Sequence, residues 1–236
     1  MKFKNVLIIG ANSDIAREFI NLIIDKTDSM LLLSRSSEKL IQFKDSLSEA
    51  HQEKISIFSY DGSLESLDDL FNLNQEFDLI FNASGSNTET KSSTEVFNSI
   101  INSNFSAPFY LIYRLSKSMT SGAVVCISSI AGDRGRMKNI MYGATKSAMT
   151  TAMSGLRQKL SNKKIHVTTV IPGFVRTKMT EGHKMPNILT SSPARIAKLC
   201  LNGIKSRKSI IYPIEWFLIS IILRLIPESM FKKMRF

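Results

Sequence analysis

The sequence predicts one α/β domain with a doubly wound parallel sheet of about seven strands, followed by an apolar helix at the C-terminus. Three observations predict this class. Short apolar runs alternate with longer helical patterns, no repeat or linker divides the chain, and small or polar residues follow several of the apolar runs. An open parallel sheet binds its ligands at such positions. The 236 residues, 43% of them hydrophobic, suffice for one full core.

The expected strands are continuous apolar runs, the pattern of strands that helices cover on both faces. They are Asn5–Ile9, Met30–Ser34, Ile55–Ser59, Asp78–Asn82, Ala123–Ser128, Val167–Ile171 and Ser209–Tyr212. Helical patterns lie between them, for example at Ile15–Ile24, Val96–Met119, Met141–Leu160 and Pro193–Lys205. A proline removes a backbone donor, so we expect the second of these helices to be interrupted near Pro108.

Residues 1–213 are expected to form one domain, in which residues 178–192 lack periodicity and cover the substrate as a lid. Residues 214–236 are expected to form an amphipathic or apolar helix with a basic tail. The apolar run Trp216–Ile226 is shorter than the roughly 20 residues that span a bilayer. Two interpretations of this helix stay open: it packs on its own domain or in a subunit interface, or it lies on an anionic membrane.

The composition limits the classes of partner. The formal net charge of +11 favours an anionic ligand or a membrane surface, and no signature of a nucleic-acid-binding module accompanies it. The two cysteines, Cys126 and Cys200, have no neighbouring cysteine or histidine, so neither a disulfide nor a metal site is expected. Reduced thiols are typical of the cytoplasm. We therefore expect a cytoplasmic protein, peripheral at the inner face of the membrane if the C-terminal helix binds lipid.

The first expected strand runs directly into Gly10 and then into a helix. Glycine permits a tight turn, and the helix N-terminus offers free N–H groups and a positive dipole to a pyrophosphate, although an ordinary turn also favours small residues. A fuller fingerprint would have glycine where Asp14 and Ala16 stand. The Asp14 carboxylate would repel a phosphate unless it points away or caps the helix, as Ser13 could also do. The candidate pyrophosphate contacts are Gly10, Asn12, Ser13, Asp14 and Ile15.

Arg35 directly follows the second expected strand, and no acidic residue comes after it until Glu38. An acidic residue at this place would bind the adenosine ribose hydroxyls and favour NAD(H), whereas a guanidinium can hold a 2′-phosphate. The sequence therefore favours NADP(H), with NAD(H) as the alternative. The alternative is that Arg35 is a solvated charge in a loop and has no role in binding.

Two more strand ends carry residues suited to a cofactor. Asp61 follows the third strand and places a carboxylate where an adenine amino group would lie. Small residues that let a backbone approach a cofactor closely follow the fourth strand. They are Asn82, Ala83, Ser84 and Gly85. Each could be a simple turn, but successive turns of this kind at neighbouring strand ends favour a dinucleotide site.

Tyr142 and Lys146 lie four residues apart on a predicted helix and therefore share one face. The ammonium would there stabilise a phenolate, which a tyrosine needs to exchange a proton with an alcohol. Such a pair alone is usually a surface contact. Ser129, at the end of an apolar strand, adds a hydroxyl that can hold a substrate oxygen, and Asn104 is a polar residue within a long helix, where a local kink or cap is its ordinary role.

The chain resembles the short-chain dehydrogenase/reductase family, whose domains have a Rossmann-type fold. The resemblance extends to about residue 213 and rests on the order of these motifs: Gly10, Asn82-Ala-Ser-Gly85, Asn104, Ser129, Tyr142-x-x-x-Lys146 and Pro172-Gly173-x-x-x-Thr177. It implies that Tyr142 is the general acid/base and that Lys146 binds the nicotinamide ribose. It also implies that Ser129 orients the carbonyl and that Asn104 holds a water in the proton relay.

The resemblance adds further cofactor contacts at the end of the sixth strand: Pro172, Gly173, Val175 and Thr177. It implies a homodimer or homotetramer that moves hydride between a nicotinamide dinucleotide and a carbonyl compound or secondary alcohol. The tail is similar, more loosely, to those of polyprenyl-phosphate keto-sugar reductases of bacterial surface-polysaccharide pathways, which suggests a keto-sugar or lipid-linked substrate. Two other classes stay open: a catalytically idle dinucleotide-sensing protein, and a nucleotide-sugar epimerase or dehydratase, which usually has a larger C-terminal domain.

Overall fold

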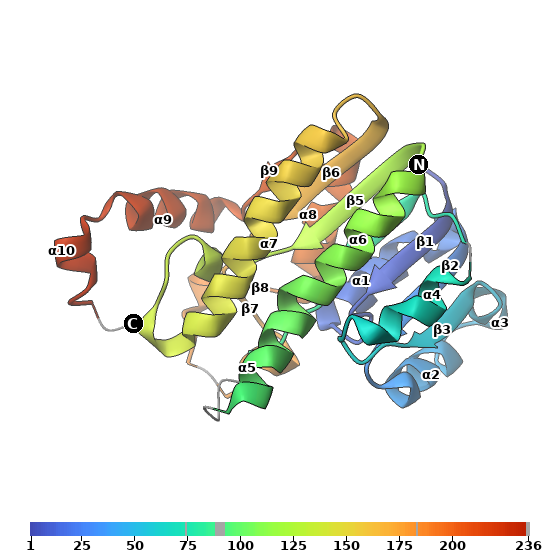
Figure 1. The fold of residues 1–236 in the computed structure, drawn as a ribbon, viewed down its shortest axis with the longest axis horizontal. Coiled ribbons are helices and arrows are strands. Elements are labelled where there is room, and N and C mark those ends of the chain that lie inside the picture. The colour runs from blue at the N-terminus through green and yellow to red at the C-terminus, as the bar shows by residue number, and fades with distance from the viewer. Residues whose placement is uncertain (74, 88–92, 183, 235–236) are drawn as a thin grey trace.

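The computed structural model describes residues 1–73, 75–87, 93–182 and 184–234 (Figure 1). Its centre is a seven-stranded sheet in the order β3-β2-β1-β4-β5-β6-β9. Every neighbouring pair in this sheet is parallel. The strands are β1 (Phe3–Ile9), β2 (Thr27–Ser34), β3 (Ile55–Ser59), β4 (Leu79–Asn82), β5 (Ser121–Ile127), β6 (Lys164–Val170) and β9 (Ile210–Ile211). The predicted fold class is confirmed, and each predicted strand overlaps an observed one.

Helices cover both faces of the sheet because successive side chains of a strand point to opposite sides. In β1, Val6 and Ile8 join one buried cluster, and Leu7 and Ile9 join the other. Helices α1 (Asp14–Ile23), α2 (Ser37–Asp45) and α8 (Pro193–Ser206) pack into the first cluster. Helices α4 (Asp68–Phe71), α6 (Ala107–Ser118) and α7 (Ile140–Lys159) pack into the second, and α6 and α7 cross the front of the sheet in Figure 1.

The long helix predicted around Pro108 changes its geometry just before this residue but does not end there. Helix α5 (Thr94–Ile101) continues through a π-helical turn (Asn102–Ser106) into α6. Proline has no N–H and its ring clashes with the carbonyl four residues earlier in a regular helix. The wider π-helical turn changes that pairing just before Pro108, which lies in the first turn of α6. The chain therefore passes this point without leaving the helix.

The segment after β6 contains structure that the sequence did not indicate. Two short parallel strands, β7 (Phe174–Val175) and β8 (Thr190–Ser191), pair with each other and bracket most of the predicted lid. Two-residue strands have no periodicity, so only the pairing between distant segments defines them. Position 183, within the predicted lid, lies outside the described residues.

The C-terminal segment forms an arm at one end of the molecule (Figure 1). It consists of α9 (Ile214–Leu225) and the short α10 (Glu228–Phe231). Elsewhere in the chain, the short helix α3 (Glu49–Gln52) precedes β3. One face of α9 is buried against the domain through Trp216, Ser220 and Leu223. Within the described residues, no helix combines the length and the apolar character needed to cross a membrane.

Candidate active site

A cleft of 320 Å³ opens at the carboxyl ends of the strands, where the strand order reverses between β1 and β4. Crevices of this kind bind ligands in open parallel sheets. Most of the residues predicted to touch cofactor or substrate line this cleft. They are Gly10, Asn12, Ser13, Asp14, Ile15, Arg35, Ala83, Ser84, Gly85, Ser129, Tyr142, Lys146, Pro172, Gly173, Val175 and Thr177.

The turn between β1 and α1 forms one wall of the cleft. Gly10 has φ +76°, and a Cβ there would lie 2.7 Å from the backbone of Ser84. The β1 and β4 turns therefore pack in contact only because residue 10 has no side chain. Ser13 is the N-cap of α1, but its side chain makes no capping hydrogen bond. The hydroxyl and the free N–H groups of the helix N-terminus are thus available to an anion in the cleft.

Asp14 does not cap α1 through its side chain either. Its Oδ2 accepts a hydrogen bond of 2.9 Å from the backbone N–H of Lys178, at the start of the predicted lid. The carboxylate that departs from the glycine fingerprint therefore points to the opposite wall of the cleft. This contact separates its charge from the turn that would hold a pyrophosphate.

The end of β2 forms the far part of the cleft. Arg35 is exposed and makes no hydrogen bond or ion pair with another described residue. Asn12 reaches across from the neighbouring turn, and its Nδ2 donates to Ser34 Oγ at 2.5 Å and to the Ser36 carbonyl at 2.9 Å. Asn12 thus fixes the loop that carries Arg35 and leaves the guanidinium free to meet a ligand.

The turn after β4 is held from beneath by Asn82. Its buried Oδ1 accepts hydrogen bonds from the N–H of Ser84 at 3.0 Å and from the Ser84 hydroxyl at 2.7 Å, and its Nδ2 donates to Cys126 Sγ. Burial raises the pKa of the Cys126 thiol, which stays neutral. Asn82 therefore shapes the turn without lining the cleft, whereas Ala83, Ser84 and Gly85 line it.

Asp61 lies at the edge of the site. Its neighbours Tyr60 and Gly62 line the cleft, but the exposed Asp61 does not. The carboxylate accepts a hydrogen bond from the N–H of Ser63 at 2.7 Å, which lowers the pKa of Asp61. The tight turn that this bond closes is a sufficient structural reason for an aspartate here.

Asn104 lies in the π-helical turn, fully buried and outside the cleft lining. Its Oδ1 accepts from the N–H of Ser86 at 2.7 Å and from Ser103 Oγ at 3.2 Å. Its Nδ2 donates to the Ser86 carbonyl at 2.9 Å and to Thr145 Oγ1 at 3.2 Å. These contacts use both acceptor and both donor positions of the amide and join the β4 turn to helix α7.

Tyr142 and Lys146 both line the cleft from the first turns of α7. The side chain of Lys146 is almost completely buried, since the residue is 3% exposed. Its Nζ donates to the Ser84 carbonyl at 3.0 Å and the Ile127 carbonyl at 3.2 Å, and lies 5.7 Å from the centre of the Tyr142 ring. An ammonium has three N–H donors, so one remains after these two contacts.

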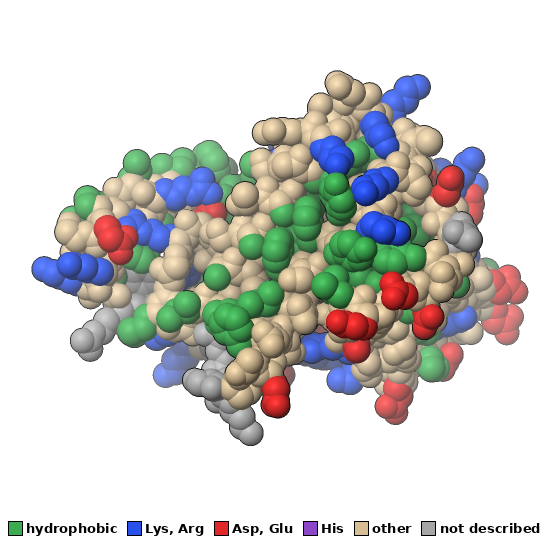
Figure 2. Space-filling model, in the orientation of Figure 1, with side chains coloured by type: hydrophobic (Ala, Val, Ile, Leu, Met, Phe, Trp, Pro, Cys, Tyr) green, Lys and Arg blue, Asp and Glu red, His purple; other side chains and the backbone are tan. Residues whose placement is uncertain are grey.

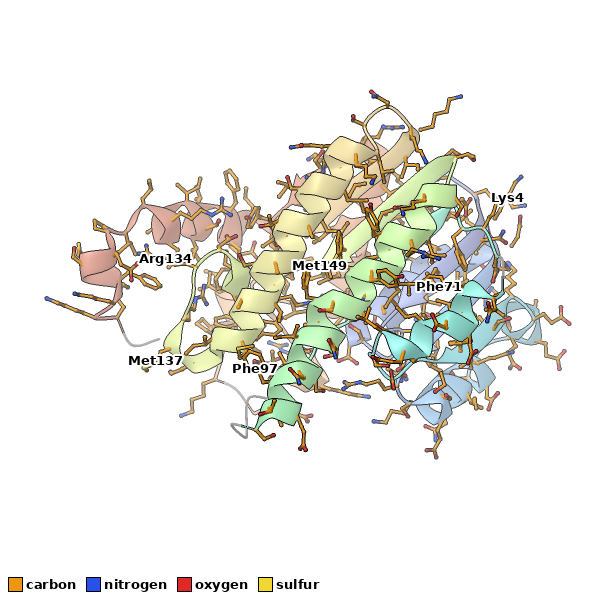
Figure 3. The ribbon with its side chains drawn as sticks, in the orientation of Figure 1. Lys4, Phe71, Phe97, Arg134, Met137 and Met149 are labelled. Carbon is orange, nitrogen blue, oxygen red and sulfur yellow. The ribbon has the colours of Figure 1, made fainter. Side chains whose placement is uncertain are left out.

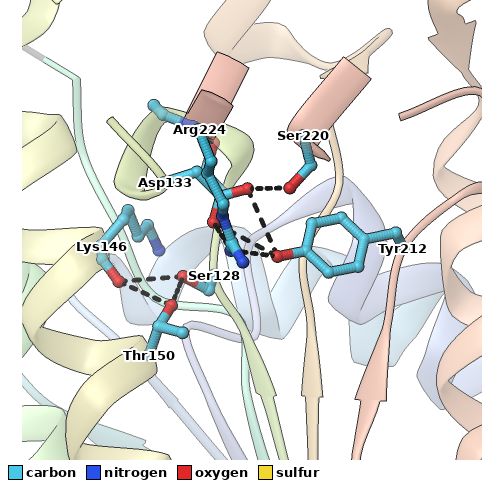
Figure 4. Close-up of polar contacts among 9 residues, drawn as sticks. Ser128, Asp133, Lys146, Thr150, Tyr212, Ser220 and Arg224 are labelled. Atoms are coloured by element: carbon cyan, nitrogen blue, oxygen red, sulfur yellow. Dashed lines mark hydrogen bonds and ion pairs between the residues drawn. The ribbon is translucent and has the colours of Figure 1, made fainter. Parts of the chain in front are cut away.

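The two serines after β5 differ in their hydrogen bonds. Ser128 bridges to helix α7, because its Oγ contacts the Lys146 carbonyl at 3.0 Å and Thr150 Oγ1 at 2.6 Å (Figure 4). Among the described residues, the Ser129 Oγ only accepts a hydrogen bond, from the N–H of Ala131 at 3.1 Å. Of the two, Ser129 keeps a hydroxyl proton that it can donate into the cleft.

The residues after β6 close the cleft opposite α1. Thr177 and Thr180 cap a short turn, in which Thr180 Oγ1 accepts from the N–H of Thr177 at 3.1 Å. A Cβ on Gly173 would lie 1.8 Å from a ring atom of Trp216. The glycine predicted as a cofactor contact is therefore also required by the indole of α9, a constraint that no local sequence pattern indicated.

Lys178, Met179 and Thr180 also line the cleft, and they belong to the segment predicted as a lid over the substrate. Other residues that line the cleft were not predicted: Ser34, Tyr60, Gly62, Ser103, Ile127 and Ser128. Ser34, Tyr60 and Ser128 sit at or directly after strand ends, so their position was the available signal. Ser103 had none, because a helical turn brings it to the cleft. The Tyr60 hydroxyl is buried without a hydrogen-bond partner among the described residues, and burial raises the pKa of this phenol.

The family of the chain follows from a match of residues 4–186 to the model of the short chain dehydrogenases. The chain belongs to the short-chain dehydrogenase family. The match includes Asn104, Ser129, Tyr142 and Lys146. Among similar curated sequences is an uncharacterised oxidoreductase of Staphylococcus aureus strain MW2, 26% identical over 209 residues that cover 84% of this chain and 89% of the relative.

Solved structures of similar fold include other dehydrogenases. One is a short-chain dehydrogenase from Burkholderia cenocepacia in complex with NADP, with a TM-score of 0.81, 14% identity, and 98% and 97% of the two chains covered. Another is a 4-hydroxyisoleucine dehydrogenase complexed with NADH, with a TM-score of 0.77, 22% identity, and coverage of 89% and 96%. At these identities the likeness shows the fold alone.

Proposed function

We propose that this short-chain dehydrogenase is an oxidoreductase that uses NADP(H) to reduce a carbonyl compound or to oxidise a secondary alcohol. One observation carries the proposal: Lys146, Tyr142 and Ser129 line the same cleft. One N–H of the Lys146 ammonium and the hydroxyl proton of Ser129 remain to be donated to a ligand. A buried cation is costly unless its contacts repay the loss of hydration. A protein that only binds a dinucleotide has no need of Tyr142, Lys146, Ser129 and Asn104 together.

The cleft fits a dinucleotide. Gly10 brings the β1 and β4 turns into contact, and the α1 N-terminus offers unpaired N–H groups for a pyrophosphate. Ala83, Ser84 and Gly85 would lie along the cofactor, and Lys146 would hold the nicotinamide ribose. Pro172, Gly173, Val175 and Thr177 would contact the nicotinamide. When bound, the cofactor supplies or accepts the hydride.

The chain's own residues handle the proton. Tyr142 donates the phenolic proton to the carbonyl oxygen in reduction and takes it back in oxidation. The Lys146 ammonium stabilises the phenolate that is left, and Ser129 donates a hydrogen bond to the same substrate oxygen. Asn104 holds the β4 turn against α7 and serves the proton relay. Its side-chain amide is fully hydrogen-bonded, so a water in the relay would bind the main chain of Asn104.

The preference for NADP(H) over NAD(H) rests on Arg35. This guanidinium is exposed at the far end of the cleft, and Asn12 fixes its loop. A guanidinium can bind a 2′-phosphate through two parallel N–H donors. The two complexes of similar fold contain NADP and NADH respectively, so the preference for NADP(H) is supported by the charge at residue 35 of this chain.

Fluorescence titration of the purified protein with NADPH and with NADH tests this proposal. We expect NADPH to bind more tightly, and Arg35→Ala to weaken NADPH binding while leaving NADH binding nearly unchanged. Loss of a charge-assisted contact of about 1.5–3 kcal/mol corresponds to roughly 10- to 100-fold. If neither NADPH nor NADH bound, the enzyme assignment would be refuted. Binding with no turnover on any carbonyl compound would favour the dinucleotide-sensing alternative.

For the substrate, we propose a keto-sugar or a lipid-linked carbonyl compound. The net charge of +11 suits an anionic substrate, and the apolar arm packs through Trp216 against Gly173, which lines the cleft. Turnover of a phosphorylated keto-sugar, compared with the unphosphorylated sugar, would test this point. Equal rates with both would remove the argument from charge.

We further propose a cytoplasmic homodimer or homotetramer. The outer surface of α5 and α6 exposes Phe97, which Figure 3 labels, and Tyr110. Hydrophobic side chains lie over α6 and α7 in Figure 2. Apolar patches of this kind mark subunit contacts. Cys126 and Cys200 are buried and unpaired, as expected in a reducing compartment. Light scattering on Phe97→Glu would reveal a dimer through its dissociation.

A further inference from the structure

The apolar residues of α9 form two opposite faces. The inner face is buried through Trp216 and Leu223. The outer face carries apolar residues at the spacing of one helical stripe. They are Ile214, Phe217, Leu218, Ile221, Ile222 and Leu225. Ile214 is 71% exposed, Leu218 61%, Ile222 60% and Leu225 75%, so the described residues leave most of this stripe uncovered.

Charges on the arm distinguish the possible occupants. Each acidic residue of α9 and α10 has a basic partner within the domain: Glu215 with Arg195 at 2.6 Å and Glu228 with Arg134 at 2.7 Å. Lys232 and Lys233 are exposed, and their side chains make no hydrogen bond or ion pair with the described residues. The uncompensated charge next to the apolar stripe is therefore positive. Figure 2 shows hydrophobic side chains along the upper edge of α9 and basic ones nearby.

We propose that the outer face of α9 docks on an anionic lipid surface. The stripe enters the boundary between headgroups and acyl chains, and Lys232 and Lys233 contact anionic headgroups. A helix of 12 residues lies along such a surface and does not cross it. A second copy of the chain is the poorer occupant, because a two-fold contact would bring the same unpaired lysines to the edge of the interface from both sides.

The arm is fixed to two segments beside the cleft, the one after β6 and the loop that follows Ser129. Trp216 packs on Gly173, and its Nε1 donates to the Leu189 carbonyl at 2.8 Å, in the segment expected to cover the substrate. Glu215 accepts two hydrogen bonds from Arg195, at 2.6 and 2.9 Å. These contacts attach the N-terminal half of α9 to the wall formed by the segment after β6.

The C-terminal half of α9 is attached to the loop that follows Ser129. The Asp133 carboxylate accepts hydrogen bonds from Ser220 Oγ at 2.6 Å, from Arg224 at 2.7 Å and from the Tyr212 hydroxyl at 3.2 Å (Figure 4). Arg134 donates to the Leu223 carbonyl at 2.7 Å and to the Ile226 carbonyl, and thereby caps the end of the helix.

Docking of α9 therefore sets the position of the cleft relative to the lipid. A carbonyl compound with an apolar chain would reach the cleft from the lipid surface, whose polar boundary lies along the arm. This delivery rests on the proposed oxidoreductase function; the docking itself does not.

Cosedimentation with vesicles, in the absence of dinucleotide, tests the docking. We expect the full chain to bind vesicles of mixed phosphatidylcholine and phosphatidylglycerol, and Leu218→Gln/Ile222→Gln to lower the partition coefficient by about tenfold or more. Lys232→Gln/Lys233→Gln should lower it by about tenfold on the anionic vesicles, as should high salt. The matched control is Ile41→Gln/Leu64→Gln, two exposed apolar residues distant from the arm, which should bind like the unaltered chain.

Two results would overturn the proposal. One is absence of binding to anionic vesicles, or equal binding by Leu218→Gln/Ile222→Gln. The other is an oligomer, seen by light scattering, that this double variant dissociates, because a second copy would then cover the stripe. Both measurements are independent of NADPH titration, so failure of the docking and failure of the proposed enzyme function remain distinguishable.

Discussion

The Asp14 carboxylate accepts a hydrogen bond from the backbone N–H of Lys178, which joins the first turn of the sheet to a segment 164 residues later. The residue that breaks the glycine fingerprint thus connects the two walls of the cleft. This hydrogen bond explains how an acidic side chain is tolerated at a helix N-terminus that should attract a pyrophosphate.

Replacement of Asp14 should release the segment that begins at Lys178. Asp14→Ala removes the acceptor, and we expect amide hydrogen exchange over residues 177–182 to rise severalfold. Asp14→Asn keeps an acceptor oxygen at the same place and should exchange almost as the unaltered chain does. Equal exchange in Asp14→Ala and the unaltered chain would show that the bond does not hold this segment. Loss of the negative charge should also tighten NADPH binding in both variants.

Ser128 and Ser129 should respond differently to alanine. Ser129→Ala should reduce turnover of whichever carbonyl compound supports NADPH oxidation by about 10²-fold or more, with unchanged thermal stability. Ser128→Ala breaks the bridge to Lys146 and Thr150 and should cost about 1–2 kcal/mol of unfolding free energy. Thermal unfolding and steady-state kinetics of the two variants test this. If Ser128→Ala were the stable and inactive variant, the catalytic role would belong to Ser128 and the structural role to Ser129.

Tyr142→Phe should retain the dinucleotide site and lose proton transfer. The substitution removes only the phenolic oxygen, so we expect NADPH titration to be unchanged and kcat to fall by about 10²–10⁴-fold. The matched control is Tyr110→Phe, an exposed tyrosine of α6, which should keep its activity. Full activity of Tyr142→Phe would exclude this residue as the general acid.

Gly173→Ala should displace the C-terminal arm. The added Cβ would lie 1.8 Å from a ring atom of Trp216, so either the indole or the backbone must move, at a cost of about 1–3 kcal/mol. Trp216 is the only tryptophan, and its emission should shift to longer wavelength as the ring becomes exposed. Gly155→Ala is the control, because nothing lies within 4 Å of its added Cβ, and it should stabilise α7 by about 1 kcal/mol. Unchanged emission and stability in Gly173→Ala would contradict the packing.

Attachment of the arm should weaken in acid. The hydrogen bond from Arg195 lowers the pKa of Glu215 below its ordinary value of 4.5. A depressed pKa contributes stability that is fully present above pH 4.5 and is lost as the pH falls through the lower folded value. Trp216 emission, followed from neutral pH downwards, should report this release. Glu215→Gln should release the arm at neutral pH and abolish that part of the pH dependence; an identical acid transition in the variant would assign it to another group.

Most of the fold could be predicted from the sequence. The strands are apolar runs because helices cover both faces of the sheet, and this pattern is visible without knowing the partners. The candidate site could also be predicted, because Gly10, Arg35 and Ser84 follow strand ends. Parallel strands bring these ends to one edge of the sheet. Tyr142 and Lys146 share a helix face by spacing alone.

The sequence by itself thus determined the class of fold, the family and the edge of the sheet where the site lies, because these depend on local periodicity and on the order of motifs. Only the tertiary structure decided which side chains meet across the cleft. Asp14 with Lys178, Gly173 with Trp216, and the four hydrogen bonds of Asn104 join segments from different parts of the chain. Their pairing depends on how helices and turns pack in three dimensions, which no periodicity along one chain encodes.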